Sequence, residues 1–328
     1  MIFVFDLEGP LSPMDHAAEA MRIIGKKLGK PDFFELFQML SLYDDELTIG
    51  KWPGYTPGDT LRLIAPIIST NLTDSEITRI SESATLTPGA KELLATIDKD
   101  DVFVASTSYR QHAMTIARKL GIKEENVNCT DLPQFEGFPY LDALVSIFEN
   151  YKASKNSIKA VKKELDVLFW KKMPQEYLKT KVCGGQRKMD VVKKAAKERG
   201  VKLSDVMVVG DSITDITMLD GVKKADGLAV SFNGNQFSAQ KANLAVSSLS
   251  LMALRPIIDA GDTWAFIEAW QGAQNKFKLL SLEVATHFKR SRIPLPSYDV
   301  VKPAELKAIL ERQKEARLAI RKEYGRLT

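Results

Sequence analysis

Residues that build disulfide or zinc frameworks are scarce in this sequence. It has two cysteines, Cys129 and Cys183, and three histidines in 328 residues. Two cysteines cannot form a disulfide-rich scaffold, and by themselves they do not supply a zinc site. A chain of this length can bury a sizeable apolar core instead, so we expect both cysteines to be buried reduced thiols.

Long apolar runs and a strong charge of one sign are also missing. No apolar run approaches the roughly 18 to 20 residues that a membrane-spanning helix needs. The opening IFVF is too short, and too soon followed by charge, for a secretion signal. The formal net charge of +4 is small for this length and argues against binding of nucleic acid by the whole chain. We therefore expect a cytoplasmic protein with no membrane span and no nucleic-acid partner.

Short apolar runs alternate with helical patterns along much of the chain. The runs are rich in β-branched residues and lack polar alternation, which is typical of strands buried on both faces of a parallel sheet. They span residues 2–5, 102–106, 126–130, 206–210 and 227–232. Helical patterns at 111–121 and 189–200 each end in glycine. The alternation predicts an α/β fold, a Rossmann-like core built on a parallel sheet.

Three segments stand outside this alternation. Residues 14–88 carry several helical patterns and are too long for one crossover, so they predict a helical cap domain inserted after the first strand. Residues 131–180 look like a second helical insertion, and residues 285–328 look like a helical C-terminal extension. The predicted α/β core is then 1–13 and 89–284. The tail has eleven Lys or Arg against five Asp or Glu, but the interleaved signs favour a solvated helix packed on the core.

Polar side chains follow the predicted strands where each strand ends. Asp6 and Glu8 follow the first strand, and the second ends in Ser106, Thr107 and Ser108. The carboxyl ends of parallel strands meet at one edge of a sheet, and functional sites form there. We therefore expect one acidic site, made by all the candidates together: Asp6, Glu8, Ser106, Thr107, Lys188, Asp211 and Asp215.

The residue types of this site predict phosphoryl chemistry. Several carboxylates around one point repel one another unless a cation offsets their charge, and hard oxygen ligands favour Mg²⁺. An ionised Asp6 could attack phosphorus and form an aspartyl-phosphate, which water then hydrolyses. Ser106, Thr107 and Lys188 would bind the phosphoryl oxygens, and Glu8 would protonate the leaving oxygen and later activate water. Each motif alone also fits a turn, a helix cap or a solvated lysine, and only their joint order favours the site.

Four motifs in this order resemble the haloacid dehalogenase superfamily of phosphohydrolases. They are DLEG at 6–9, VFVAS at 102–106, the lysine of GGQRKMDVV at 188, and VVGDSITDITML at 208–219. The segment GLAVSFNGNQFSAQKANLAV also resembles phosphoserine-phosphatase-like members. The resemblance implies a nucleophile at Asp6 and a dependence on Mg²⁺. It implies that the metal is bound by Asp6, by the main-chain carbonyl of Glu8 and by Asp211 with its partner Asp215.

Two functions from different classes remain open at this point. The first is a Mg²⁺-dependent phosphatase acting on a small phosphorylated metabolite, and a phosphomutase is a variant of it. The second is an accessory or regulatory subunit of a larger assembly with a vestigial site. DLEGPLS followed by a helical insertion also resembles an archaeal group named as the R subunit of energy-converting hydrogenase A. Glu8 stands where most phosphatases of the superfamily have Asp, while dehalogenase members generally lack an acid there, which disfavours dehalogenation.

Overall fold

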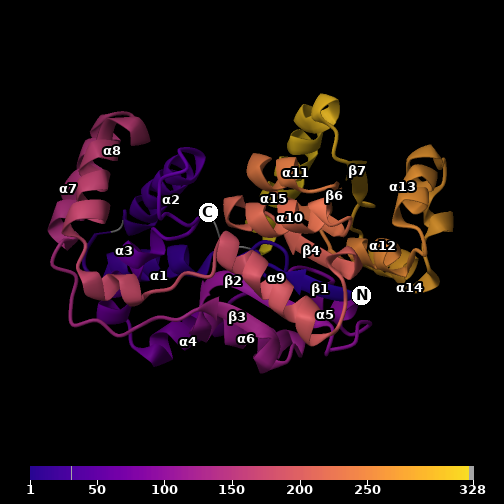
Figure 1. Ribbon diagram of the computed structural model, residues 1–328, viewed down its shortest axis with the longest axis horizontal. Helices are drawn as coiled ribbons and strands as arrows, with labels where there is room; N and C mark the ends of the chain where they lie inside the picture. The colour runs from indigo at the N-terminus through magenta and orange to yellow at the C-terminus, as the bar shows by residue number, and fades with distance from the viewer. Residues whose placement is uncertain (31, 325–328) are drawn as a thin grey trace.

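A seven-stranded sheet forms the centre of the computed structural model, which describes residues 1–30 and 32–324 (Figure 1). The strand order is β3-β2-β1-β4-β5-β6-β7, with β7 antiparallel to β6 and all other neighbours parallel. The strands are β1 (Ile2–Phe5), β2 (Val102–Tyr109), β3 (Val127–Thr130), β4 (Val206–Gly210), β5 (Leu228–Phe232), β6 (Leu244–Ser247) and β7 (Ser297–Val300). The predicted α/β fold with a mainly parallel sheet is confirmed.

Successive residues of β1 point to opposite faces of the sheet, and each face has its own helices. Ile2 and Val4 belong to the core cluster that includes buried residues of α9 (Gln186–Glu198) and α10 (Ile216–Lys224). Phe3 and Phe5 belong to the larger core cluster on the other face. Of the other helices, α6 (Arg110–Leu120) packs on β2 and β3, and α11 (Gln236–Lys241) packs on β5. The chain also forms α5 (Ala90–Leu94), which packs on α6, and α12 (Arg255–Asp259). The sheet is therefore covered on both faces, as its apolar strands predict.

The two helical insertions pack against each other. The first holds α1 (His16–Lys27), α2 (Phe33–Ile49), α3 (Leu61–Asn71) and α4 (Asp74–Glu82). The second holds α7 (Leu141–Ala153), α8 (Ile158–Asp166), the π-helical turn η2 (Val167–Lys172) and η3 (Gln175–Lys179). The Tyr43 hydroxyl of α2 donates to Asp166 Oδ1 of α8 at 2.9 Å. Figure 1 shows α2, α7 and α8 gathered at one end of the molecule, so the two insertions form one helical layer.

The C-terminal part contributes more than the predicted helix. It contains α13 (Thr263–Gly272), α14 (Leu282–Ser291), β7 and α15 (Leu306–Tyr324). β7 completes one edge of the sheet, and α15 packs on β6 and α11. Residue 31 of the predicted cap and residues 325–328 of the predicted extension lie outside the described residues. The residue boundaries of the three predicted segments stay a prediction.

Short 3-10 turns complete the chain. The turns are η1 (Glu124–Asn126), η4 (Leu203–Asp205), η5 (Ile213–Asp215), η6 (Leu251–Leu254), η7 (Lys276–Leu279) and η8 (Pro303–Glu305).

Both cysteines are free thiols, but Cys183 is buried and Cys129 is partly exposed, so the expectation that both are buried is wrong for Cys129. Within residues 1–30 and 32–324, no helix is both long and apolar enough to cross a membrane.

Candidate active site

Three aspartates from two strand ends lie together at the carboxyl edge of the sheet. Asp6 follows β1, and Asp211 and Asp215 follow β4, the neighbouring strand. One carboxylate oxygen from each lies within 4.8 Å of the others, and all three residues are buried. The Asp6 N–H donates to the Val209 carbonyl at 2.8 Å, which holds the two strand ends in register. The pairing of β1 with β4 thus creates the acidic cluster.

Lys188 bridges two members of this cluster. Its Nζ lies 2.9 Å from Asp6 Oδ1 and 2.7 Å from Asp215 Oδ1, and its side chain has no exposed surface. Burial alone would lower the pKa of Lys188, but the Asp215 and Asp6 carboxylates outweigh it and hold that pKa above its usual range. Lys188 is therefore a charged ammonium group fixed beside Asp6.

Asp215 uses both of its oxygens to organise the loop after β4. Oδ1 accepts from Lys188, and Oδ2 accepts from the backbone N–H groups of Asp211 at 2.9 Å and Ser212 at 3.0 Å. A Cβ on Gly210 would come within 2.5 Å of Asp215 Cγ, so only glycine leaves room for this side chain to fold back. Asp215 thus belongs to the cluster mainly as the group that orients Lys188 and Asp211.

Asp6 and Asp211 each keep one oxygen available. Asp6 Oδ1 accepts from the Leu7 N–H and from Lys188, and Asp211 Oδ2 pairs with Arg317. In the part of the chain that the structure describes, the second oxygen of each has no hydrogen-bond partner. Burial, and then the nearby Asp215, raise the pKa of Asp6. Two available hard oxygens in an anionic, buried cluster fit a Mg²⁺ ion.

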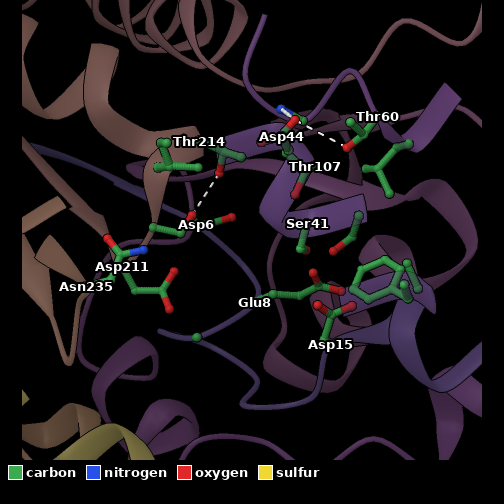
Figure 2. A pocket seen from close by; sticks show the side chains of 18 of the residues that line it. Asp6, Glu8, Asp15, Ser41, Asp44, Thr60, Thr107, Asp211, Thr214 and Asn235 are labelled. Carbon is green, nitrogen blue, oxygen red and sulfur yellow. Dashed lines mark hydrogen bonds between the residues drawn. The ribbon is translucent and has the colours of Figure 1, made fainter. Parts of the chain in front are cut away.

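Glu8 directs its carboxylate away from Asp6. Its Oε1 accepts from the His16 N–H at 3.0 Å and lies 3.9 Å from His112 Nε2. Figure 2 shows the Glu8 and Asp15 carboxylates together, on the far side of the pocket from Asp6 and Asp211. Burial, and then the neighbouring Asp15, raise the pKa of Glu8 to about 8. The carboxyl group predicted as acid and base is thus protonated over much of the neutral range, but it does not contact Asp6 in this structure.

The predicted phosphate ligands of β2 differ from one another in position. Ser106 is fully buried, its Oγ accepts from the Ser108 N–H at 3.1 Å, and it does not line the cavity. Thr107 and Ser108 do line it, because the pairing of β2 with β3 shifts register between Ala105 and Tyr109. Ser106 therefore supports the bend that brings Thr107 to the cavity. Ser108, which the sequence places at the end of the same strand without assigning it a role, is thus a cavity residue as well.

A cavity of about 410 Å³ lies between these strand ends and the helical layer. The strand ends contribute Asp6, Thr107 and Asp211 to its lining, and the helical layer contributes residues of α2 and α3 (Figure 2). The residues from the helical layer include Ser41, Asp44, Asp45, Leu61 and Ile64. The helical layer therefore closes over the acidic cluster.

The loop between α2 and α3 reaches the glycine pair that precedes Lys188. A Cβ on Gly184 would lie 2.0 Å from the carbonyl oxygen of Pro57. Asp59 of the same loop lies 3.4 Å from Arg187 of α9. The glycine at position 184 is therefore required by this close contact between the helical layer and the core.

Replacing Gly184 with alanine is expected to separate the loop from the core. The added methyl group overlaps the Pro57 carbonyl, and overpacking of this kind costs about 1–3 kcal/mol. We expect a lower melting temperature and faster proteolytic cleavage in residues 50–59. Gly137→Ala is the matched control, since nothing lies within 4 Å of a Cβ there. Equal behaviour of the two variants would show that the contact is unimportant.

Asp44 fixes the same loop to α2. Its Oδ1 accepts from the Tyr55 hydroxyl, from the Gly58 N–H at 2.7 Å and from the Thr60 hydroxyl at 3.3 Å. Burial exceeds the effect of these hydrogen bonds and raises the pKa of Asp44 to about 7. The ionised form is therefore disfavoured in the folded chain.

The stability of the Asp44→Asn variant relative to the natural chain is expected to rise with pH. Between about pH 4 and 7 an unfolded Asp44 is ionised while the folded one keeps its proton, so the natural chain loses stability as the pH increases. Asparagine has no proton to lose. Chemical unfolding of both proteins at pH 4.5 and 7.5 measures the difference, with the exposed Asp142→Asn as control. A difference that does not change with pH would contradict the assignment.

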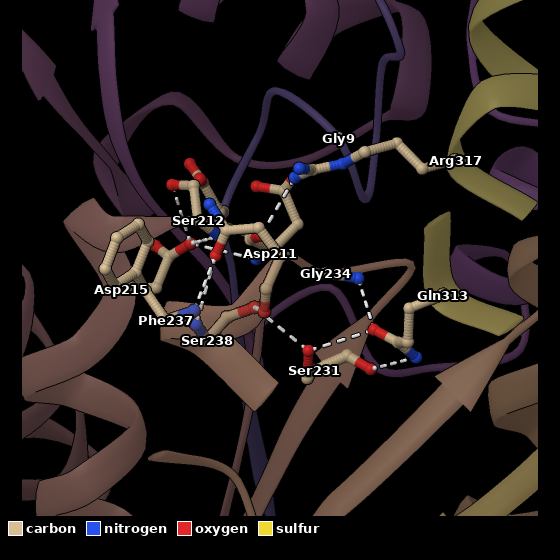
Figure 3. Close-up of polar contacts among 12 residues, drawn as sticks. Gly9, Asp211, Ser212, Asp215, Ser231, Gly234, Phe237, Ser238, Gln313 and Arg317 are labelled. Carbon is tan, nitrogen blue, oxygen red and sulfur yellow. Dashed lines mark hydrogen bonds and ion pairs between the residues drawn. The ribbon is translucent and has the colours of Figure 1, made fainter. Parts of the chain in front are cut away.

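Arg317 is a site residue that the sequence analysis missed. It comes from α15, and its Nη2 donates to the Asp211 carbonyl at 2.8 Å and forms an ion pair with Asp211 Oδ2 (Figure 3). Gly9 leaves room for this arrangement, because a Cβ there would lie 2.5 Å from Asp211 Cγ. A signal did exist in the tail: Ile309, Gln313 and Arg317 follow one another at four-residue spacing on one helix face.

The comparisons with known proteins agree with this geometry. Residues 66–252 match the family model described as haloacid dehalogenase-like hydrolase. The chain belongs to this family. The buried aspartates Asp6, Asp211 and Asp215 are consistent with the metal site of such a hydrolase. No curated protein matches the chain.

Solved structures extend the similarity over the fold. Gene product AF1437 from Archaeoglobus fulgidus superposes with a TM-score of 0.74 at 24% identity, covering 97% of this chain and 96% of that one. A phosphoserine phosphatase in apo form has a TM-score of 0.50 at 17% identity, covering 77% and 96%. A phospho-aspartyl intermediate analogue of phosphoserine phosphatase has a TM-score of 0.50 at 19% identity, covering 78% and 96%. These similarities concern the fold, with helices added in this chain.

Proposed function

We propose that this protein is a Mg²⁺-dependent phosphatase that hydrolyses a small phosphorylated metabolite through an aspartyl-phosphate at Asp6. One observation carries the proposal: Asp6 and Asp211 each offer an available oxygen, next to Lys188, at the base of a cavity. A structural scaffold gains nothing from buried carboxylates that repel one another. The fold of a phosphoserine phosphatase with a phospho-aspartyl intermediate analogue supports the same reaction class.

Each side chain of the site would have its own role in the proposed reaction. The available oxygen of Asp6 forms a bond to phosphorus while the bond from phosphorus to the ester oxygen breaks. Lys188 lowers the cost of ionising the buried Asp6, and Lys188 and Thr107 donate to the phosphoryl oxygens. Glu8 turns from Asp15 toward the leaving oxygen and gives it a proton, then takes a proton from the water that attacks the aspartyl-phosphate. Ser106 acts in this scheme by supporting Thr107.

A Mg²⁺ ion would be held by Asp211, by the main-chain carbonyl of Glu8 and by the Asp6 oxygen that does not attack phosphorus. When bound, it supplies positive charge that offsets the carboxylates and the phosphoryl oxygens. Asp215, whose oxygens are both engaged, would act by orienting Asp211 and Lys188.

An accessory subunit of a larger, hydrogenase-type assembly is the second candidate. One observation favours it: Arg317 already pairs with Asp211, which reduces the need for a metal ion at that carboxylate. In that case the site would be vestigial and the chain would act through a protein partner. A phosphomutase would use the same groups but transfer the phosphoryl group to a sugar. We propose a cytoplasmic location for any of these roles.

Phosphate release from a panel of phosphomonoesters tests the proposal. The full chain is incubated with Mg²⁺ or with EDTA, and free phosphate is measured, with sugar phosphates included to detect transfer. We expect release with Mg²⁺ and none with EDTA. Transfer without release would indicate a mutase, and an inert protein across the panel would favour the accessory subunit.

A further inference from the structure

Helix α15 is firmly attached to the sheet beside the site. Gln313 is fully buried: its Oε1 accepts from the Ser231 hydroxyl at 3.1 Å and from the Gly234 N–H. Its Nε2 donates to the Ser231 carbonyl and the Ser247 hydroxyl, both at 3.2 Å. Figure 3 shows Gln313 and Arg317 reaching from the same helix toward the ends of β5 and β4. The helix is therefore placed accurately enough to contribute to the site.

Arg321 lies one helical turn beyond Arg317 and lines the same cavity as Asp6. Arg317 is engaged by Asp211, whereas Arg321 makes no hydrogen bond or ion pair among the residues that the structure describes. Burial, and then the nearby Arg317, lower the pKa of Arg321. An arginine offers five N–H donors, and those of Arg321 are not taken up by the described protein groups around the cavity.

The acidic residues nearby do not explain this arginine. Asp211, Asp15 and Glu8 are close enough to attract it, but none of them forms an ion pair with it. Asp15 accepts from the Ala18 N–H as the N-cap of α1, and Glu8 accepts from the His16 N–H. In this structure both carboxylates are thus engaged by backbone N–H groups of α1, and Arg321 lines the cavity without an ion-pair partner among the described residues.

We infer that Arg321 binds a second anionic group of the substrate, a carboxylate or a second phosphate, while the phosphoryl group lies at Asp6. A guanidinium group binds either anion through two parallel hydrogen bonds. The inference rests on the proposed function for the phosphomonoester itself. It makes Arg321 a specificity-determining residue supplied by the C-terminal helix, not by the helical layer over the cavity.

Three two-carbon phosphate esters test this in the full chain with Mg²⁺: ethyl phosphate, phosphoglycolate and ethylene glycol bisphosphate. The measured quantity is the ratio of kcat/KM for each ester with a second anionic group to that for ethyl phosphate, which has only its phosphate. Arg321→Gln is expected to lower this ratio about 10- to 100-fold, the usual loss for a hydrogen bond to a charged group. Lys322→Gln removes the same charge from an exposed neighbour and should leave the ratio unchanged. Comparing phosphoglycolate with ethylene glycol bisphosphate shows whether the second group bound is a carboxylate or a phosphate.

Binding measured by calorimetry separates this inference from the proposed function. With Asp6→Asn as background, the chain should bind phosphoglycolate or ethylene glycol bisphosphate more tightly than ethyl phosphate. Adding Arg321→Gln should remove this preference. If that holds while the natural chain hydrolyses no ester, the inference stands and the phosphatase proposal fails. Equal affinity for all three esters, or an equal loss for all three in Arg321→Gln, would overturn the inference.

Discussion

Asp6→Asn is expected to abolish phosphate release. Asparagine keeps the size of the side chain but cannot form the acyl-phosphate bond, and loss of a nucleophile lowers kcat by more than about 10³-fold. The fold should survive, because burial already disfavours the charged form of Asp6 and Lys188 keeps Asp215 as a partner. Steady-state assays with Mg²⁺ and p-nitrophenyl phosphate measure the loss, and thermal unfolding checks the fold.

The matched control for this variant is Asp205→Asn. Asp205 is exposed and precedes β4, at the opposite end of the sheet from Asp211. We expect full activity in this control. Residual activity in Asp6→Asn comparable to that of the control would remove Asp6 from the reaction.

Lys188→Met is expected to cost both activity and stability. The methionine fits the space of the lysine, but it leaves Asp6 and Asp215 buried without their counter-ion. Removing one partner of a buried ion pair costs about 3–5 kcal/mol, because the remaining charge is uncompensated. Chemical unfolding should therefore show a large loss of stability, and phosphate release should be undetectable.

A second substitution separates the two effects of Lys188→Met. Adding Asp215→Asn removes one of the uncompensated carboxylates, so the double variant should recover part of the lost stability. It should recover no activity, because the donor to the phosphoryl oxygens is still missing. A double variant less stable than Lys188→Met would show that the charge balance is not what Lys188 contributes.

The centre of the fold could be predicted from sequence because its strands are buried on both faces. β1 and β4 lie at residues 2–5 and 206–210, as the apolar runs predict. β7 could not be predicted, since SYDV is a partly exposed edge strand with no continuous apolar run. β2 continues to Tyr109, beyond the apolar run, because the polar residues of STSY remain in the irregular strand.

The candidate site could be predicted where it depends on strand ends and not where it depends on packing. Neighbouring parallel strands bring Asp6 and Asp211 to one edge whatever the helices do. Thr107 lines the cavity and Ser106 does not. This difference depends on a register shift that no residue type signals. Arg317 reaches Asp211 across 106 residues of sequence, and only the docking of α15 through Gln313 shows that the tail belongs to the site.

Trapping the covalent intermediate tests the central claim most directly. The full chain is mixed with Mg²⁺ and excess p-nitrophenyl phosphate, quenched rapidly in acid, and reduced with borohydride, which converts an acyl-phosphate to an alcohol. Peptide mass spectrometry then locates the reduced carboxyl group. Our account predicts reduction at residue 6 alone, dependent on Mg²⁺ and absent from Lys188→Met. Phosphate release without modification of residue 6, or modification of a different carboxylate, would contradict it.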